Sequence, residues 1–148
     1  MLNSENVIIK SFAELSKPEL YAILNLRIKV FCVEQECPYQ DVDNKDQEAT
    51  HVYIQDDSKI AAYARIIKEK ESEYHIGRVV VDEEYRKLGL ATTIMKQCIE
   101  TIKRNDNATI IISAQSYLKD FYKHLGFENT GSYYLEDDIP HEQMQITA

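Results

Sequence analysis

Glycine is scarce in this chain: 148 residues contain only four, and none stands in a Gly-x-Gly-x-x-Gly pattern or a Gly-Lys-Ser/Thr loop. Those loops need glycine because their backbone passes close to phosphate groups in conformations that a side chain hinders. The chain therefore lacks the signatures of the dinucleotide-binding and nucleoside-triphosphate-binding folds.

Cysteine is also rare. Cys32, Cys37 and Cys98 form an odd set without Cys-x-x-Cys spacing, so neither a disulfide framework nor a zinc knuckle is indicated. The run Asp41–Asp46 resembles a calcium loop only superficially, because lysine stands at its fifth position and glycine is missing at its sixth. No metal site is predicted, and reduced thiols are expected.

Long apolar runs are missing as well. No stretch approaches the roughly 20 apolar residues that span a bilayer, and the first residues do not combine a basic segment with an apolar one. We therefore expect a cytoplasmic protein that has no membrane partner.

Positive charge is in deficit, with 17 basic against 25 acidic residues and a formal net charge of −8. A negative protein repels a polyanion, so nucleic acid is not expected as a partner, whereas a cationic or amine-bearing partner is favoured. Solubility alone would also explain this sign.

The remaining composition is that of one globular unit. Hydrophobic residues make up 44% and charged residues 28%, and no stretch rich in Gly, Ser or Pro marks a linker. A single domain over residues 1–148 is predicted.

The hydrophobic pattern predicts a mixed α/β sheet with helices on both sides. Ser16–Glu19 indicates a helix start with proline in the first turn, and residues 34–48 lose periodicity as a functional loop would, with or without a short second helix. Besides that first helix, which reaches about Phe31, the expected elements are strands 7–12, 51–55, 59–68, 74–81 and 109–114, helices from 89 to about 104 and up to 125, and a final hairpin of 132–135 and 143–147 around 136–140.

One segment predicts an anion site. The β-branched run Val79–Val81 passes through a charged turn into a helix start at Gly89. Amides in the first turn of a helix have no intrahelical partners and lie at the positive end of its dipole, so they can hold a phosphate. The residues expected to surround the anion are Arg86, Lys87, Leu88, Gly89, Leu90, Ala91 and Thr92.

Two motifs in order carry a family resemblance. Arg86-x-x-Gly89-x-Ala91 resembles the acyl-CoA pyrophosphate loop of the GNAT acetyltransferases, and Tyr122-x-x-x-Gly126-Phe127 is similar to their second signature. By itself, the first motif also occurs in helices whose glycine only eases packing. The two motifs together, in this order, indicate the family. Nearly the whole chain resembles the small branch typified by the ElaA protein, through residues 26–35, 37–43 and 131–144.

The resemblance implies the GNAT acyl-CoA N-acyltransferase fold: a mostly antiparallel sheet whose fourth and fifth strands splay to admit the pantetheine arm. It also implies acetyl-CoA as the cofactor, with transfer of its acetyl group to a primary amine of a small molecule or protein by direct attack in a ternary complex. The acceptor itself and the oligomeric state, a homodimer among the options, are left open.

Cofactor-binding residues follow from the family pattern. Amides of Val79, Val80 and Val81 would polarise the thioester carbonyl if the strand is bulged there; in an ordinary strand they would all be engaged in the ladder. Gln115, where many family members have asparagine, would hold the pantetheine. Tyr122 would protonate the departing thiolate, since a phenol with a reference pKa of about 10 stays protonated. A purely structural core tyrosine is the alternative.

The general base is predicted as Glu34, because the family places acceptor-binding residues at the end of the first helix. His51 and His75 are alternatives, and a water relay would also suffice. Glu34, Gln35, His51, His75 and His141 are expected to bind the acceptor. The acidic run 41–46 is interpreted as a rim that attracts a cationic acceptor, or else as an inert surface loop.

Two other functions remain open at this stage. A non-catalytic acyl-CoA-binding sensor would bind the cofactor without turnover, and an interaction protein of the same fold would not bind it.

Overall fold

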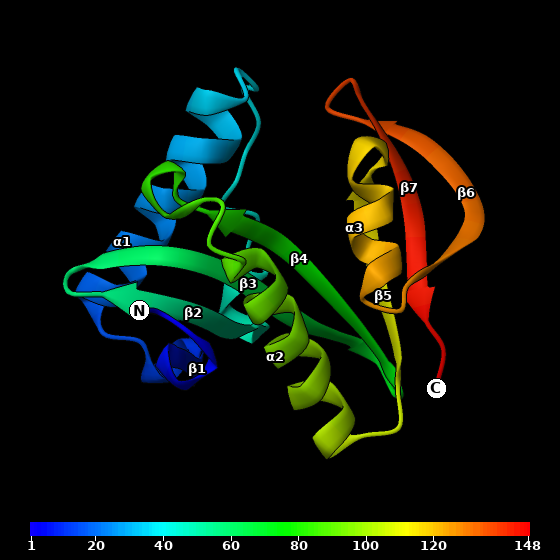
Figure 1. Ribbon diagram of the computed structural model, residues 1–148, viewed down its shortest axis with the longest axis horizontal. Coiled ribbons are helices and arrows are strands. Elements are labelled where there is room, and N and C mark those ends of the chain that lie inside the picture. The colour runs from blue at the N-terminus through cyan, green and yellow to red at the C-terminus, as the bar shows by residue number, and fades with distance from the viewer.

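Seven strands form one sheet in the order β1-β2-β3-β4-β5-β7-β6 (Figure 1). The computed structural model describes residues 1–148. Every neighbouring pair is antiparallel except β4 and β5, which are parallel. The strands are β1 (Val7–Ser11), β2 (Thr50–Asp56), β3 (Lys59–Lys70), β4 (Glu73–Val81), β5 (Thr109–Gln115), β6 (Glu128–Glu136) and β7 (Ile139–Ile146). The predicted mixed sheet is confirmed.

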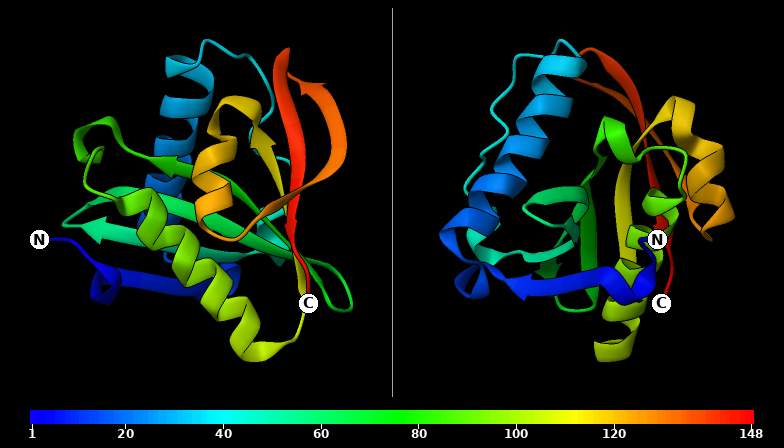
Figure 2. Two further views of the ribbon diagram at one scale, coloured as in Figure 1. Left: turned by 45° about the vertical axis from the view of Figure 1, so that its right-hand side comes forward. Right: turned by 60° about the vertical axis from the view of Figure 1, so that its left-hand side comes forward.

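Helices cover both faces of the sheet (Figure 2, right). The helix α1 (Lys17–Ile28) packs on one face, where its Ile23 joins a core cluster with Tyr63 of β3. The helices α2 (Leu90–Asn105) and α3 (Lys119–His124) cover the other face, where Ala62 and Ala64 of β3 pack against α2. Successive residues of a strand point to opposite faces, so β3 contributes to both core layers. No helix has the length and apolarity needed to cross a membrane.

The start of α1 is set by a capping box. The Ser16 hydroxyl accepts from the Glu19 amide at 3.1 Å, and the Glu19 carboxylate accepts from the Ser16 amide at 2.8 Å. The helix continues beyond α1 as a π-helical segment, Lys29–Glu34, so Glu34 ends a helix rather than beginning a loop. The expected second helix in the following segment is a single 3-10 turn, Asp46–Glu48.

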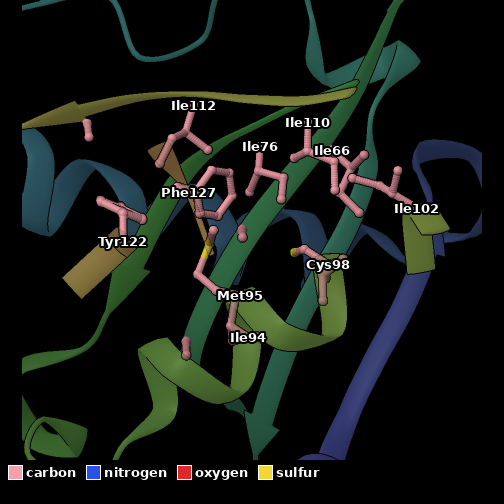
Figure 3. Packing of buried hydrophobic residues seen from close by; sticks show 14 of the residues in the cluster. Ile66, Ile76, Ile94, Met95, Cys98, Ile102, Ile110, Ile112, Tyr122 and Phe127 are labelled. Carbon is pink, nitrogen blue, oxygen red and sulfur yellow. The ribbon is translucent and has the colours of Figure 1, made fainter. Parts of the chain in front are cut away.

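The larger core lies between α2, α3 and the sheet. Ile94, Met95 and Cys98 are fully buried against β-strand residues that include Ile76 and Ile112 (Figure 3). Each such side chain contributes about 1.5–3 kcal/mol relative to an exposed one. Burial also raises the pKa of the Cys98 thiol to about 12, so this cysteine is an inert packing residue.

The parallel strands β4 and β5 stay together for only three residue pairs. The pairs join residues 73–75 of β4 to residues 109–111 of β5, and none follows. Beyond them the strands diverge (Figure 1), while β5 remains paired with β7 up to Gln115. The predicted splay of the fourth and fifth strands is confirmed.

A bulge distorts β4 just beyond the point of divergence. Gly77 pairs with Arg65 and Val80 pairs with Tyr63, so two β4 residues, Arg78 and Val79, oppose one β3 residue. Arg78 has the left-handed φ of +52°, which is unusual for a residue with a side chain. The bulge that the oxyanion hypothesis requires is present, and it takes a backbone amide out of the regular ladder.

The expected bounds of the final hairpin were wrong. The hairpin turns at Asp137–Asp138, and β7 begins at Ile139, so Pro140 lies inside a strand. Proline is tolerated there because the β5 ladder starts only at His141 and loses no donor.

Candidate functional site

A cavity of about 560 Å³ opens where β4 and β5 diverge. Its walls are formed by β4, β5, α3, the segment after α1, and the turn between β6 and β7. A second cavity, of about 350 Å³, adjoins it at the start of α2, and the two share Val81, Arg86, Ala91 and Phe121. Together they connect the helix start with the splayed strands.

The start of α2 presents its backbone to the smaller cavity. Gly89, with a φ of +76°, is the N-cap, and the first helical hydrogen bond runs from the Thr93 amide to the Gly89 carbonyl at 3.1 Å. The amides of residues 90–92 therefore have no carbonyl partner within the helix. No atom lies within 4 Å of the position that a Cβ on Gly89 would occupy. A phosphate can approach this backbone directly.

Arg86 and Glu34 form a two-point ion pair at the boundary of the two cavities. Nη1 of Arg86 lies 2.7 Å from Oε2 of Glu34, and Nη2 lies 2.9 Å from Oε1. Arg86 Nε also donates to the Val81 carbonyl at 3.2 Å. The hydrogen bonds from Arg86 lower the pKa of Glu34, and the same contact raises the pKa of Arg86.

This contact argues against the general-base role predicted for Glu34. A carboxylate whose pKa is lowered is a weaker proton acceptor, and Glu34 does not line the main cavity, although its neighbour Gln35 does. Glu34 neutralises the arginine that was expected to meet the pyrophosphate. Sequence pattern alone could not reveal a partner 52 residues away.

Tyr122 is a core residue, and its role as the acid stays a prediction. Its side chain is almost fully buried, and its ring packs edge-on against those of Phe121 and Phe127, at centroid distances of 5.0 and 6.0 Å. Figure 3 shows Tyr122 and Phe127 in this core. It also lines the main cavity. Burial raises the pKa of Tyr122 to about 12, so the phenol stays protonated and can donate.

The opposite side of the cavity is polar and aromatic. His141 and Gln115 are paired residues on β7 and β5, and their side chains lie on the sheet face that α2 and α3 do not cover. The structure thus brings together Gln115, Gln35 and His141 of the predicted set. It adds residues that sequence reasoning did not identify: Tyr39, Ser113, Tyr117, Glu136 and Asp137.

The other two histidines predicted as acceptor ligands lie outside this cavity. His51 is fully buried; its Nδ1 lies 2.6 Å from the Tyr63 hydroxyl and its Nε2 lies 2.9 Å from the Asp46 carbonyl. Burial lowers the pKa of His51, so it is a neutral core residue. His75 lies where β4 and β5 still pair, 3.2 Å from a Glu73 carboxylate oxygen.

The predicted acidic rim is instead a buried ionic cluster. Arg27, which is fully buried, donates from Nε to Asp41 at 2.8 Å and from Nη1 to Asp46 at 2.7 Å. Arg65 donates to the same Asp46 oxygen at 3.0 Å and to Asp43 at 2.6 Å. Although burial opposes it, the hydrogen bonds from Arg27 and Arg65 lower the pKa of Asp46. These three carboxylates are therefore paired with arginines and do not form an open acidic rim.

The cluster also anchors the bulge of β4. Arg78 Nε lies 3.0 Å from Oδ1 of Asp41, its Nη2 lies 3.3 Å from Oδ2 of Asp43, and its guanidinium stands 5.3 Å from the centroid of the Tyr39 ring. Arg78 thus joins the segment after α1 to the bulge. Sequence reasoning missed it, because the acidic run and Arg78 are separated by more than thirty residues.

Comparison with known proteins identifies the family. A model of the acetyltransferase (GNAT) domain matches residues 16–148. The chain belongs to this GNAT family. It is 40% identical to the UPF0039 protein C11D3.02c of Schizosaccharomyces pombe over 142 residues, which are 94% of this chain and 95% of that protein.

Solved structures of similar GNAT proteins share the fold. An acyl-CoA N-acyltransferase from Pseudomonas aeruginosa is 37% identical, with a TM-score of 0.90 over 95% of this chain and 99% of that one. Escherichia coli ElaA is 36% identical, with a TM-score of 0.89 over 95% and 98% of the two chains. The ElaA-like branch is thereby confirmed, and the chain is an acyl-CoA-dependent transferase by family.

Proposed function

We propose that residues 1–148 act as one N-acetyltransferase domain, which transfers the acetyl group of acetyl-CoA to a primary amine of a small molecule or protein. The observation that carries this proposal is the path formed by the two adjoining cavities. It runs from the unbonded amides at the start of α2, between the splayed strands, to a polar chamber on the opposite face.

The cofactor would enter along this path. Its pyrophosphate meets the amides of residues 88–92 and the cations of Arg86 and Lys87, because helix N-termini and arginine both favour oxyanions. Its pantetheine arm lies between the diverging parts of β4 and β5, whose facing edges do not pair with each other. Gln115, at the end of β5, lines this space. The name of the similar Pseudomonas protein supports an acyl-CoA as the ligand.

The chemistry would take place beside the bulge. Amides at Val79–Val81 polarise the thioester carbonyl, since a strand with an unpaired amide can donate to a developing oxyanion. The neutral amine attacks, the C–N bond forms, the C–S bond breaks, and Tyr122 donates its phenolic proton to the leaving thiolate. Cys98 is buried in the core, and desolvation together with the charge of Asp137 raises the pKa of the cavity-lining Cys37 thiol. Direct transfer is therefore favoured over an acyl-cysteine intermediate.

The experiment has two parts. Calorimetry with coenzyme A tests the cofactor path, and release of free thiol from acetyl-CoA tests transfer to a panel of ethylamine, 1,4-diaminobutane, benzylamine and Nα-acetyl-lysine. Binding together with thiol release and acetylated product is expected. Binding without turnover of any amine would favour the sensor function, and no binding would refute the cofactor assignment.

A further inference from the structure

With Glu34 paired to Arg86, the proton acceptor for the amine must be sought elsewhere in the cavity. His141 is the only histidine among the residues that line it. Its side chain is 7% exposed, and its ring stacks on Tyr134 of β6 at a centroid distance of 6.1 Å and an interplanar angle of 16°. The ring is therefore held in one orientation by the sheet on which it lies.

The two ring nitrogens of His141 have different partners. Nδ1 lies 2.7 Å from the carbonyl oxygen of Ile139, an acceptor that requires a hydrogen on Nδ1. In the neutral ring, Nε2 then carries the lone pair. Nε2 lies 3.4 Å from Oε2 of Glu136, whose side chain is 54% exposed at the cavity wall. A carboxylate in this place stabilises the imidazolium that forms when Nε2 accepts a proton.

The position of His141 suits an attack on the proposed thioester. It is the β7 residue directly paired with Gln115, and the side chains of paired residues lie about 4.5–5.5 Å apart at Cβ. The β6–β7 turn and the segment after α1 lie at the same end of the sheet in both views (Figures 1 and 2). They close the chamber around the end of β5 from two sides.

The charges around His141 are mostly acidic. Besides the arginines, the titratable groups that line the cavity with His141 or stack on its ring are Tyr134, Glu136, Asp137, Tyr117, Tyr122, Cys37 and Tyr39. On its own face, β5 presents only the uncharged Ser113 and Gln115. Arg78 and Arg86 also line the cavity, but each is already paired with carboxylates. An ammonium group would therefore meet the carboxylates of Glu136 and Asp137 at the cavity wall, which no lysine or arginine neutralises.

We propose that His141 is the general base of the transfer and that Glu136, beside Asp137, draws the acceptor in as an alkylammonium ion. This inference rests on the proposed function and gives His141 the role first predicted for Glu34. The bound alkylammonium ion first releases one proton to solvent and becomes the neutral amine. Nε2 of His141 then removes the second proton, which the nitrogen loses as its C–N bond to the acetyl carbon forms. The sulfur leaves with the C–S electron pair and takes the Tyr122 proton. Solvent carries the His141 proton back to the phenolate, so that the net products are the amide, the free thiol and one proton released to solvent.

The kinetic test compares His141→Gln and Glu136→Gln with wild type on the best amine of the panel. His141→Gln is expected to lower kcat at least 100-fold and to remove the acidic limb of the pH–rate profile, with coenzyme A affinity unchanged within about twofold. Glu136→Gln is expected to raise KM for the cationic amine several-fold, with less effect on kcat. The control is His124→Gln on α3, because His124 Nδ1 also lies 2.7 Å from a backbone carbonyl but no carboxylate faces it.

A second measurement does not require turnover. Long-range proton–nitrogen NMR on the protein saturated with coenzyme A reports which ring nitrogen of His141 carries the hydrogen in the neutral state, and it serves if His141→Gln fails to fold. Hydrogen on Nδ1 supports the proposal, and hydrogen on Nε2 overturns it. If wild type transfers and His141→Gln transfers equally well, the base assignment fails alone. If wild type transfers to no amine, the proposed function fails and the base assignment fails with it.

Discussion

The Arg86 guanidinium and the Glu34 carboxylate lie face to face, with oxygen–nitrogen distances of 2.7 and 2.9 Å. One of these residues belongs to the pyrophosphate motif, and the other ends the π-helical segment beside the acceptor chamber. If the cofactor binds as proposed, its pyrophosphate competes with Glu34 for Arg86. The pair links the two halves of the site.

Replacing Glu34 should tighten cofactor binding. Both side chains are more than a third exposed, and exposed pairs contribute about 0–1 kcal/mol, so Glu34→Gln is expected to improve coenzyme A affinity up to about fivefold in calorimetry. The matched control is Glu100→Gln, which breaks the Glu100–Arg104 pair at the far end of α2 and should leave affinity unchanged. Unchanged affinity with loss of transfer in Glu34→Gln would restore Glu34 as the base.

Gly89 should be needed for the cofactor more than for folding. Gly89→Ala places a Cβ at a φ of +76°, which costs about 1–2 kcal/mol, and sets it in the open space where a phosphate would lie. Gly131→Ala introduces the same strain at a φ of +91°, also without a contact, and Gly131 lines neither cavity. Similar destabilisation is expected in urea, whereas only Gly89→Ala should weaken coenzyme A binding, by tenfold or more. Equal binding by both variants would argue against the phosphate site.

The variant Tyr122→Phe separates the proposed acid role of Tyr122 from its role in core packing. The ring and its contacts with Phe121 and Phe127 remain, so stability should change by less than about 1 kcal/mol. Loss of the hydroxyl should lower kcat about 100-fold without changing coenzyme A affinity. Tyr133→Phe, on an exposed tyrosine of β6, is the control. Wild-type rates in Tyr122→Phe across the amine panel would rule out the acid role.

The buried ionic cluster should be intolerant of a missing partner. Asp46→Asn leaves Arg27 and Arg65 without the carboxylate they share, and removal of one partner from a buried pair costs about 3–5 kcal/mol. Glu84→Gln, in the exposed Lys59–Glu84 pair, should cost less than about 1 kcal/mol. The free energy of unfolding in urea measures both. A loss below 1 kcal/mol in Asp46→Asn would show that the cluster is not a structural anchor.

Glu19 should contribute to stability in a pH-dependent way. Hydrogen bonds from the Ser16 amide, the Tyr53 hydroxyl and Lys10 lower its pKa from 4.5 to about 2. A folded-state pKa below the unfolded one adds stability above about pH 4.5 that is lost as the pH falls toward about 2. Glu19→Gln should therefore be about 1–2 kcal/mol less stable than wild type at pH 7, with the difference vanishing near pH 2.

Thermal unfolding from pH 2 to pH 7 tests the Glu19 prediction. Glu5→Gln, at an exposed carboxylate near the N-terminus, is the control and should follow wild type throughout. A gap between Glu19→Gln and wild type that stays constant with pH would assign the effect to lost packing instead of ionisation.

The order of the elements and the ends of the helices were predictable from local sequence. The Ser16 cap, the left-handed Gly89 before α2 and the left-handed Gly126 after α3 stand where their residue types predict, because caps and turns depend on a few neighbouring residues. The splay and the bulge of β4 came from the family resemblance. The residue pattern of the strand itself, Glu73–Val81, predicts neither the splay nor the bulge.

The acceptor half was not readable in the same way. Glu34 looked like a free carboxylate, and the run Asp41–Asp46 looked like an exposed acidic rim. Both are held by arginines from distant segments, Arg86 for the first and Arg27, Arg65 and Arg78 for the second. The sequence gives the sign of each side chain's charge, but it does not show which residue forms an ion pair with it.

By itself, then, the sequence determined the order of the elements, the helix starts and the place where a phosphate would meet backbone amides. These features depend on propensities and hydrogen bonds within a few residues. Only the tertiary structure decided which acidic residues are free: it paired Glu34 and Asp46 with buried or cavity-facing arginines and left Glu136 beside His141. Whether a charge can act on a substrate depends on burial and on long-range partners, and both are set by packing.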